Sequence, residues 1–206
     1  NTGTLSTING IQVAGGTTTF QNNMVRVGID AAGTAITDNR AINGISDAGG
    51  TNNYYFNSVY VGGSANGSLS TFAFASSVTL NTRIFRNNIF VNVRSNAGSG
   101  RSIAIGLGGT WPNPSGLTLN NNIYFASGTG TVMGRNTSSV TDYTDMNAWR
   151  GALGTGFDIG SGFGDPNFAV PTGTSSTVDL HVQGTTPAEW EKALSHGWTG
   201  ASVPFQ

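Results

Sequence analysis

The chain has 206 residues, of which 37% are hydrophobic and 9% are charged, with a formal net charge of −1 at pH 7. Its 9 Lys and Arg residues, balanced by 10 Asp and Glu, leave no phosphate-neutralising surface and argue against a nucleic-acid partner. The sequence has no run of about 18 apolar residues that would span a membrane. It also has no cysteine for disulfides or thiolate metal sites, while its 31 glycines and scarce helix formers favour a secreted β protein.

A short pattern recurs four times: an apolar residue, any residue, Asn, then Asn or Ser, and then an apolar run. The copies occupy residues 20–25, 55–60, 85–90 and 119–124. One asparagine of each copy marks the register, and these marks lie about 30 to 35 residues apart, within the range of solenoids and propellers. The marks are Asn22, Asn57, Asn87 and Asn121. A second family of strand-like segments lies between or after the marks, at residues 41–45, 71–75, 102–107 and, more weakly, 131–133.

Each repeat therefore supplies two or three short strands joined by turns rich in Gly, Asn, Ser and Pro. A unit of this length cannot enclose a core alone, but parallel coils stacked about 4.8 Å apart can do so. Asn at the repeated position tolerates a left-handed turn, and stacked Asn side chains hydrogen-bond along a ladder. A propeller needs longer blades, and a sandwich does not require one motif four times. The pattern therefore favours a parallel β-helix.

The copies at residues 85–92 and 119–124 resemble the repeats of right-handed parallel β-helices in the pectate-lyase-like superfamily. The resemblance covers residues 18–135, where four copies share one register. It implies an all-β fold, namely a right-handed parallel β-helix of about four to six coils. The superfamily includes lyases, hydrolases, epimerases, phage spikes and non-catalytic adhesins, so the resemblance implies no single activity.

The segment after the repeats contains a predicted short helix near residues 145–153, with Thr144 or Asp145 as its N-cap and Gly154 just beyond its end. The motifs that follow resemble the closing coils of large exported bacterial surface proteins, which implies an extracellular or cell-surface location. Their order is Trp149, Asp158, Asp165-Pro166-Asn167-Phe168, Asp179-Leu180-His181 and Thr186-Pro187-Ala188. We therefore expect one β-helix domain over residues 1–206, with repeats at 18–135 and closing coils and a cap at 136–206, as a segment of a longer secreted protein.

The acidic residues form no paired catalytic motif in the repeats, so no catalytic residue is assigned. Asp142 and Asp145 are candidates for a Ca²⁺ site, with helix capping as the favoured alternative. His181 and His196 each lack a second histidine at zinc-ligand spacing, so both are expected to be structural. We expect no other cofactor.

Aromatic side chains are the candidate ligand-binding residues. Tyr60, Phe90 and Tyr124 each lie three residues after a register asparagine, so we expect them to form one stacked column. The column either packs in the core or between coils, or it presents an aromatic platform to a glycan. Trp111, in a proline-rich loop, is a further candidate for an exposed aromatic residue. Arg86, the variable residue inside the third copy, is expected to face solvent.

Repetition without a converging catalytic set predicts a non-enzymatic extracellular module, an adhesin or stalk segment that binds a glycan or a neighbouring protein chain. Two alternatives stay open. The first is a polysaccharide lyase or glycoside hydrolase of the same fold, which needs acidic residues, or an Arg beside Ca²⁺ ligands, on one groove wall. The second is a structural subunit of an extracellular assembly, whose exposed coil ends stack against another chain.

Overall fold

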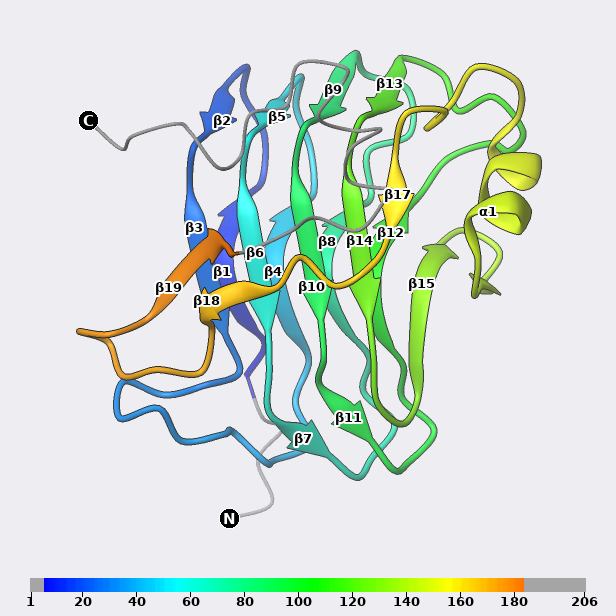
Figure 1. The fold of residues 1–206 in the computed structure, drawn as a ribbon. Helices are drawn as coiled ribbons and strands as arrows, with labels where there is room; N and C mark the ends of the chain where they lie inside the picture. Colours follow the sequence, from blue (N-terminus) through cyan, green and yellow to red (C-terminus); the bar gives the residue numbers. More distant parts are fainter. Residues whose placement is uncertain (1–5, 184–206) are drawn as a thin grey trace.

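The computed structural model describes residues 6–183, which form a parallel β-solenoid of about four turns with a single short helix (Figure 1). Strands of successive turns lie side by side and form the walls of the solenoid. This arrangement confirms the nearly all-β, stacked-coil architecture that the repeats predict. No helix within residues 6–183 is long and apolar enough to cross a membrane.

Three sheets form the walls, and within each wall the strands of successive turns pair in parallel. The six-stranded sheet contains β1 (Ile8–Val13), β4 (Ile42–Asp47), β8 (Thr71–Ser76), β12 (Ser102–Leu107), β15 (Thr131–Asn136) and β16 (Thr141–Tyr143). The four-stranded sheet contains β2 (Thr19–Gln21), β5 (Asn53–Tyr55), β9 (Arg83–Arg86) and β13 (Leu117–Asn120). The five-stranded sheet contains β3 (Met24–Val27), β6 (Ser58–Val61), β10 (Ile89–Asn92), β14 (Ile123–Ala126) and β17 (Gly162–Phe163). Only the last strand of the six-stranded sheet, β16, pairs antiparallel, with β15.

Two smaller pairs complete the strand set. β7 (Ser64–Ala65) pairs with β11 (Ser95–Asn96) in parallel at one corner of the solenoid. β18 (Phe168–Val170) and β19 (Asp179–Val182) pair antiparallel and form a hairpin outside the stacked coils.

The core lies inside the solenoid, where alternate side chains of each strand stack on their counterparts one turn away. Phe20, Tyr54, Phe85 and Leu119 form one such file in the four-stranded sheet. Ring centroids are 5.0 Å apart for Phe20 and Tyr54 and 5.4 Å apart for Tyr54 and Phe85. Burial of one such side chain stabilises the fold by about 1.5–3 kcal/mol, so these files supply most of the driving force.

An asparagine ladder runs along the turn between the four-stranded and five-stranded sheets. Asn23 donates through Nδ2 to Oδ1 of Asn57 at 2.8 Å, Asn57 to Asn88 at 2.9 Å, and Asn88 to Asn122 at 3.0 Å. The backbone N–H of each donor asparagine binds the same oxygen of the next turn. The backbone N–H of Asn122 donates to Ser161 Oγ at 2.8 Å, which ends the ladder at the last turn.

The predicted ladder is present, but its register is corrected by one residue in three of its four turns. Of Asn22, Asn57, Asn87 and Asn121, only Asn57 is a member. The residue before each ladder position instead has left-handed backbone, with φ of 57° at Asn22, 55° at Phe56, 60° at Asn87 and 58° at Asn121. These residues turn the chain from one sheet into the next, and Asn is favoured there because it tolerates positive φ. Asn is therefore favoured at two adjacent positions for two different reasons. The first position needs left-handed backbone, and the second makes the hydrogen bonds of the ladder.

The aromatic column predicted from Tyr60, Phe90 and Tyr124 is corrected as well. Phe90 pairs with Tyr124 and Val59, and both aromatic rings lie completely buried in the core. Tyr60 pairs instead with Val91 and points to the outer face of the five-stranded sheet. The prediction aligns Asn57 of the second copy with the register asparagines of the other copies, whereas the structure aligns Phe56 with them. Tyr60 therefore falls one residue beyond the position of Phe90 and Tyr124.

The helix α1 (Met146–Leu153) lies at the C-terminal end of the stack and confirms the short helix predicted near residues 145–153 (Figure 1). Asp145 caps its N-terminus by accepting two backbone N–H groups of the first turn. Trp149 projects from the helix into the end of the core and is fully buried. A Cβ at Gly134 would lie 2.5 Å from the Trp149 ring, so the last turn of the six-stranded sheet needs glycine there.

Asp158 fastens this cap to the last coils. Its carboxylate accepts hydrogen bonds from the indole Nε1 of Trp149 at 2.7 Å, from the hydroxyl of Tyr124 at 3.0 Å, and from Ser161 Oγ. Burial of the carboxyl raises the pKa of Asp158, and the three donors oppose that rise. Trp149 and Asp158 of the predicted closing motif therefore act together in the cap.

The β18–β19 hairpin covers part of the outer face of the five-stranded sheet and crosses in front of β3 and β6 (Figure 1). Phe168 and Leu180 of the hairpin are buried against Tyr60, Ile89 and Ile123 of the sheet. The last predicted closing motif, residues 186–188, and His196 lie outside the described residues, and the extent of the domain stays a prediction.

Candidate functional site

A row of polar side chains crosses the outer face of the four-stranded sheet. Gln21, Tyr55, Arg86 and Asn120 pair in register on its successive strands. Each directly follows a residue of the inward file, and alternation along a strand turns it outward. Gln21 and Arg86 are exposed, whereas Tyr55 and Asn120 are half-buried. We call these four residues the polar row. The prediction that Arg86 faces solvent is confirmed.

The neighbouring outward file of the same sheet is uncharged. It contains Thr19, Asn53, Ile84 and Thr118, which pair in register beside the polar row. Arg86 is therefore the single charged side chain among the outward residues of these four strands. The face combines hydroxyl and amide groups with one aromatic ring, one guanidinium and the aliphatic side chain of Ile84.

A pocket of about 270 Å³ lies at the C-terminal end of the polar row. Arg86, Thr118 and Asn120 line it from the sheet, while Thr155 and Phe157 line it from the loop that follows α1. The pocket therefore extends the row from the flat sheet into a concave site with an aromatic wall. Concave sites of this kind bury more of a ligand than a flat face does.

Asn120 is oriented by its neighbours on the last turn. Its Oδ1 accepts the backbone N–H of Gly160 at 2.6 Å and that of Asn121 at 3.0 Å. These two bonds fix the amide plane and identify the oxygen. The Nδ2 group of Asn120 is consequently the part of the amide that can donate to a ligand in the pocket.

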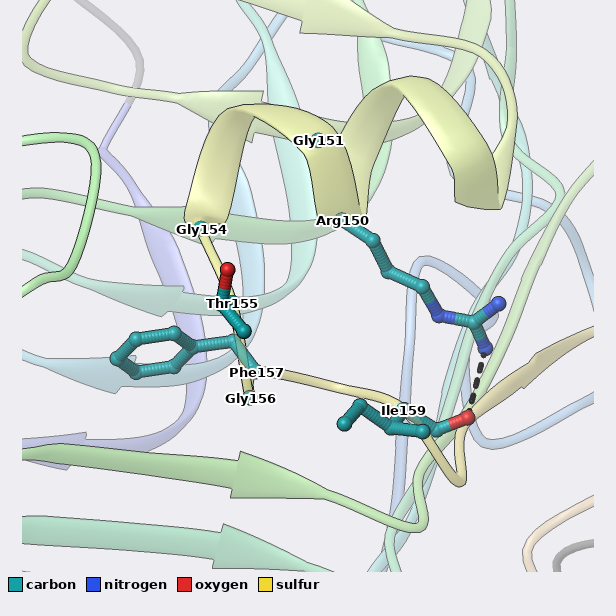
Figure 2. A pocket seen from close by; sticks show the side chains of 7 residues that line it. All are labelled: Arg150, Gly151, Gly154, Thr155, Gly156, Phe157 and Ile159. Carbon is teal, nitrogen blue, oxygen red and sulfur yellow. Dashed lines mark hydrogen bonds between the residues drawn. The ribbon is translucent and has the colours of Figure 1, made fainter.

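A second pocket of about 330 Å³ lies on the other side of the same loop, between residues 155–157 and α1 (Figure 2). The Arg150 guanidinium at its edge is held by backbone carbonyls. Nε donates to Asp158 at 2.8 Å, and Nη2 donates to Ile159 at 3.2 Å and also to Ser161. In Figure 2 the Phe157 ring points away from Arg150. Arg150 therefore holds the segment that directly follows residues 155–157, which line both pockets.

The linings of the two pockets contain two cations, Arg86 and Arg150, and no carboxylate. General acid–base hydrolysis needs a pair of carboxyl groups on either side of the scissile bond. The linings do offer an aromatic ring for stacking, and guanidinium, amide and hydroxyl groups for hydrogen bonds. The arrangement is suited to holding a hydroxyl-rich ligand.

The other aromatic candidate, Trp111, is half-buried. Its ring stacks on Tyr143 at a centroid distance of 5.8 Å and contacts Trp149 edge-on at 5.3 Å. Trp111 therefore packs beside the cap. Of the four predicted ligand-binding aromatics, Phe90 and Tyr124 are in the core, and Tyr60 lies on a different sheet from the polar row.

The two calcium candidates each have other partners. Asp142 forms a two-pronged ion pair with Arg135, at 2.5 and 3.0 Å, and lies 3.6 Å from Arg101. Asp145 is the N-cap of α1. Within residues 6–183, no group of three or more His, Asp or Glu side chains could hold a metal ion. His181 contacts Asp179 at 2.5 Å on the hairpin.

Buried charges inside the solenoid make structural contacts. Asp47 accepts hydrogen bonds from Ser76 Oγ at 2.9 Å and Asn52 Nδ2 at 3.1 Å, and burial raises its pKa. Arg83 and Arg94 donate to backbone carbonyls, and burial lowers the pKa of both guanidinium groups. None of these three charged groups lines the pockets beside the polar row.

Comparisons of the chain with protein-family models, with curated proteins and with solved structures find no match. The function therefore has to be argued from the chemistry of the polar row and its pockets. Sequence reasoning missed Tyr55 and Phe157 as members of this site. An alignment of Tyr54 with Phe20 and Phe85 would have placed Tyr55 beside Arg86 on the outer face. No sequence pattern predicts that the loop of Phe157 lies against the sheet.

Proposed function

We propose that the chain is a non-enzymatic β-solenoid module that binds a glycan along the polar row. The single observation that carries this proposal is the alignment of Gln21, Tyr55, Arg86 and Asn120 on four successive strands. Strands in a sheet are about 4.8 Å apart, which is comparable with the length of one sugar residue. A chain of sugars laid across the strands therefore meets one side chain of the row at each step.

The chemistry of the row matches the surface of a sugar. An aromatic ring packs against the C–H face of a pyranose, and Tyr55 supplies such a ring beside solvent. Amide and guanidinium groups donate hydrogen bonds to ring hydroxyls, and Gln21, Arg86 and Asn120 supply them. The pocket at the end of the row adds Phe157 as a second aromatic surface. These groups favour binding without bond cleavage, since no carboxylate lines either pocket.

The setting that we propose for the module is the exterior of a bacterial cell, as an adhesin or stalk segment of a larger exported protein. The fourfold repeat, the asparagine ladder and the closing helix support kinship with the pectate-lyase-like β-helices. The low content of charged residues and the absence of cysteine in the sequence are compatible with that setting. A stacked solenoid is also a rigid spacer, because each turn is fixed to the next by continuous hydrogen bonding.

A glycan array tests the proposal with the wild-type chain and three variants. Tyr55→Ala removes the exposed ring, Arg86→Gln removes the charge but keeps hydrogen-bonding capacity, and Tyr55→Phe keeps the ring. Arg101→Gln, at an exposed arginine that directly precedes β12 of the six-stranded sheet, is the matched control. We expect Tyr55→Ala and Arg86→Gln to weaken binding of the same glycans by roughly tenfold, while Tyr55→Phe and the control retain it.

The same glycans are then incubated with the wild-type chain in a lyase and hydrolase screen. Binding without turnover is the expected result. Turnover of any of these glycans would overturn the non-enzymatic part of the proposal. A complete lack of binding, or binding unchanged in Tyr55→Ala and Arg86→Gln, would overturn the polar row as the binding face.

A further inference from the structure

A separate pocket of about 200 Å³ lies on the outer face of the five-stranded sheet, under the segment that leads into the β18–β19 hairpin. Tyr60, Val91 and Phe125 line it from the sheet, and Asp165 and Phe168 line it from that segment. This pocket belongs to a different sheet from the polar row. Its lining combines aromatic and aliphatic groups with the polar Ser127 and Asn167 and one carboxylate.

The strand register determines the shape of this pocket. Tyr60 and Phe125 both pair with Val91, one on each side, so they occupy one outward file with the small Val91 between them. Neighbouring strands are about 4.8 Å apart, so Tyr60 and Phe125 lie two strand spacings apart, on either side of the buried Val91. A cation is attracted to an aromatic face within about 6 Å of the ring centroid. The register therefore brings two aromatic side chains to the same pocket, where both can contact one bound cation.

Phe168 supplies the third ring of the cage. It lies in the hairpin, is buried, and meets Tyr60 edge-on at a centroid distance of 6.5 Å and an interplanar angle of 66°. The hairpin thus closes the cage from the side away from the sheet. The rings come from three separate segments of the chain, so the folded register is needed to assemble them.

Asp165 gives the cage its charge and is the single charged residue in the lining. Its Oδ1 accepts the backbone N–H of Asn167 at 2.8 Å, which positions the carboxylate beside the pocket. Burial raises the pKa of the Tyr60 hydroxyl, the negative charge of Asp165 adds to that rise, and the positive charge of Arg26 opposes it. Arg26 follows Tyr60 in the same file, but its guanidinium is turned to the carbonyls of Asp30 and Gly173.

We propose that this pocket binds a quaternary ammonium group of a small molecule, with choline as the simplest example. Three aromatic rings attract a diffuse, weakly hydrated cation, and the carboxylate neutralises its charge. A calcium ion takes about six to eight oxygen ligands, whereas the side chains of this lining offer one carboxylate, one amide and hydroxyl groups. The Asp165 carboxylate is exposed, so it attracts a bound cation but contributes nothing to binding a neutral apolar ligand.

Titration of the wild-type chain with choline, followed by NMR of the aromatic and valine methyl signals, tests the proposal. The control ligand is 3,3-dimethylbutan-1-ol, which has the shape of choline but carries no charge. We expect choline to bind at least roughly tenfold more tightly than this alcohol and to shift the signals of Val91 and Phe125. Equal binding of the two compounds, or no binding of choline, would overturn the proposal.

Two variants locate the site. Asp165→Asn removes the charge and Phe125→Leu removes a half-buried ring while filling its space, and each should weaken choline binding by roughly three- to thirtyfold. Tyr60→Phe keeps its ring and should retain binding. Tyr55→Leu on the polar row is the matched aromatic control and should bind choline like the wild type. Choline affinity that is unchanged in Asp165→Asn and Phe125→Leu would overturn the assignment, whatever the glycan array shows.

Discussion

The asparagine ladder makes a quantitative prediction for Asn88, whose amide bonds to both neighbouring turns. Its Oδ1 accepts from the backbone N–H and Nδ2 of Asn57, and its Nδ2 donates to Asn122 Oδ1 and to the carbonyls of Tyr54 and Arg86. Asn88→Asp keeps the shape and Oδ1 but places a second oxygen against three acceptors. The two protons of Nδ2, which these three acceptors share, are lost, and this should lower the free energy of unfolding by about 2 kcal/mol.

The buried charge of Asn88→Asp adds a pH-dependent cost. Burial among acceptors raises the folded-state pKa of the new carboxyl above its unfolded value of about 3.9, and each unit of that rise costs about 1.4 kcal/mol at neutral pH. The charge cost is therefore absent below the unfolded pKa and grows as the pH rises through the folded pKa. We expect the variant to lose more stability, relative to wild type, at neutral pH than near the unfolded pKa.

Urea unfolding followed by circular dichroism, at neutral pH and at acidic pH, measures both parts of this prediction. The control is Asn22→Asp, the same chemical change at an exposed position with φ of 57°, where Asp is also tolerated. The control should change stability by less than about 0.5 kcal/mol. If Asn88→Asp is as stable as this control, or if its loss does not depend on pH, the ladder does not hold the turns together as argued.

Three further predictions concern the cap and the core. Gly134→Ala should destabilise the chain by about 1–3 kcal/mol in calorimetry, because its Cβ would lie 2.5 Å from the Trp149 ring. A Cβ added at Gly151 of α1 would meet no neighbouring group within 4 Å, so Gly151→Ala should instead stabilise the chain by about 0.5–1 kcal/mol. If both variants lose stability, or if neither does, the packing of the cap is contradicted. Trp149→Phe removes a hydrogen bond to Asp158 and should cost about 1–3 kcal/mol, and an unchanged Tm would contradict this role. Since burial raises the folded-state pKa of Asp47, its contribution is complete below the unfolded pKa and is lost as the pH rises. Asp47→Asn should therefore gain stability relative to wild type between acidic and neutral pH in urea unfolding, and a relative loss would refute the reasoning.

The architecture could be predicted because the repeat leaves a strong local signal. An apolar residue followed closely by asparagine occurs once in each turn, and stacked turns need this combination at a regular spacing. The helix was predictable from Asp145 and Gly154, which mark its two ends. These features depend on short-range chemistry, so a single sequence is sufficient to show them.

The register was off by one residue because the second turn replaces an expected asparagine with Phe56. A bulky residue is rarely found at φ of 55°, so sequence alignment favours Asn57 for the left-handed position. The ladder then moves to the wrong residues in the other turns. The true frame aligns Phe56 with Asn22, Asn87 and Asn121, and it brings Tyr55 into line with Arg86.

The pockets could not be predicted because they join segments with no common pattern. Phe157 comes from the loop after α1 and reaches the sheet through the contacts of the cap, such as those of Arg150. Asp165 and Phe168 reach the outer face of the five-stranded sheet because the hairpin folds back over it. In both cases the long-range packing of the closing segment decides which side chains meet.

Chemical-shift mapping of a bound glycan tests the central claim most directly, since it shows which face of the solenoid a ligand occupies. The isotope-labelled chain is titrated with the strongest glycan from the array. We expect the largest amide shifts at Tyr55, Arg86, Asn120 and residues 155–157. Shifts confined to the six-stranded sheet would place the ligand on another wall and contradict the account.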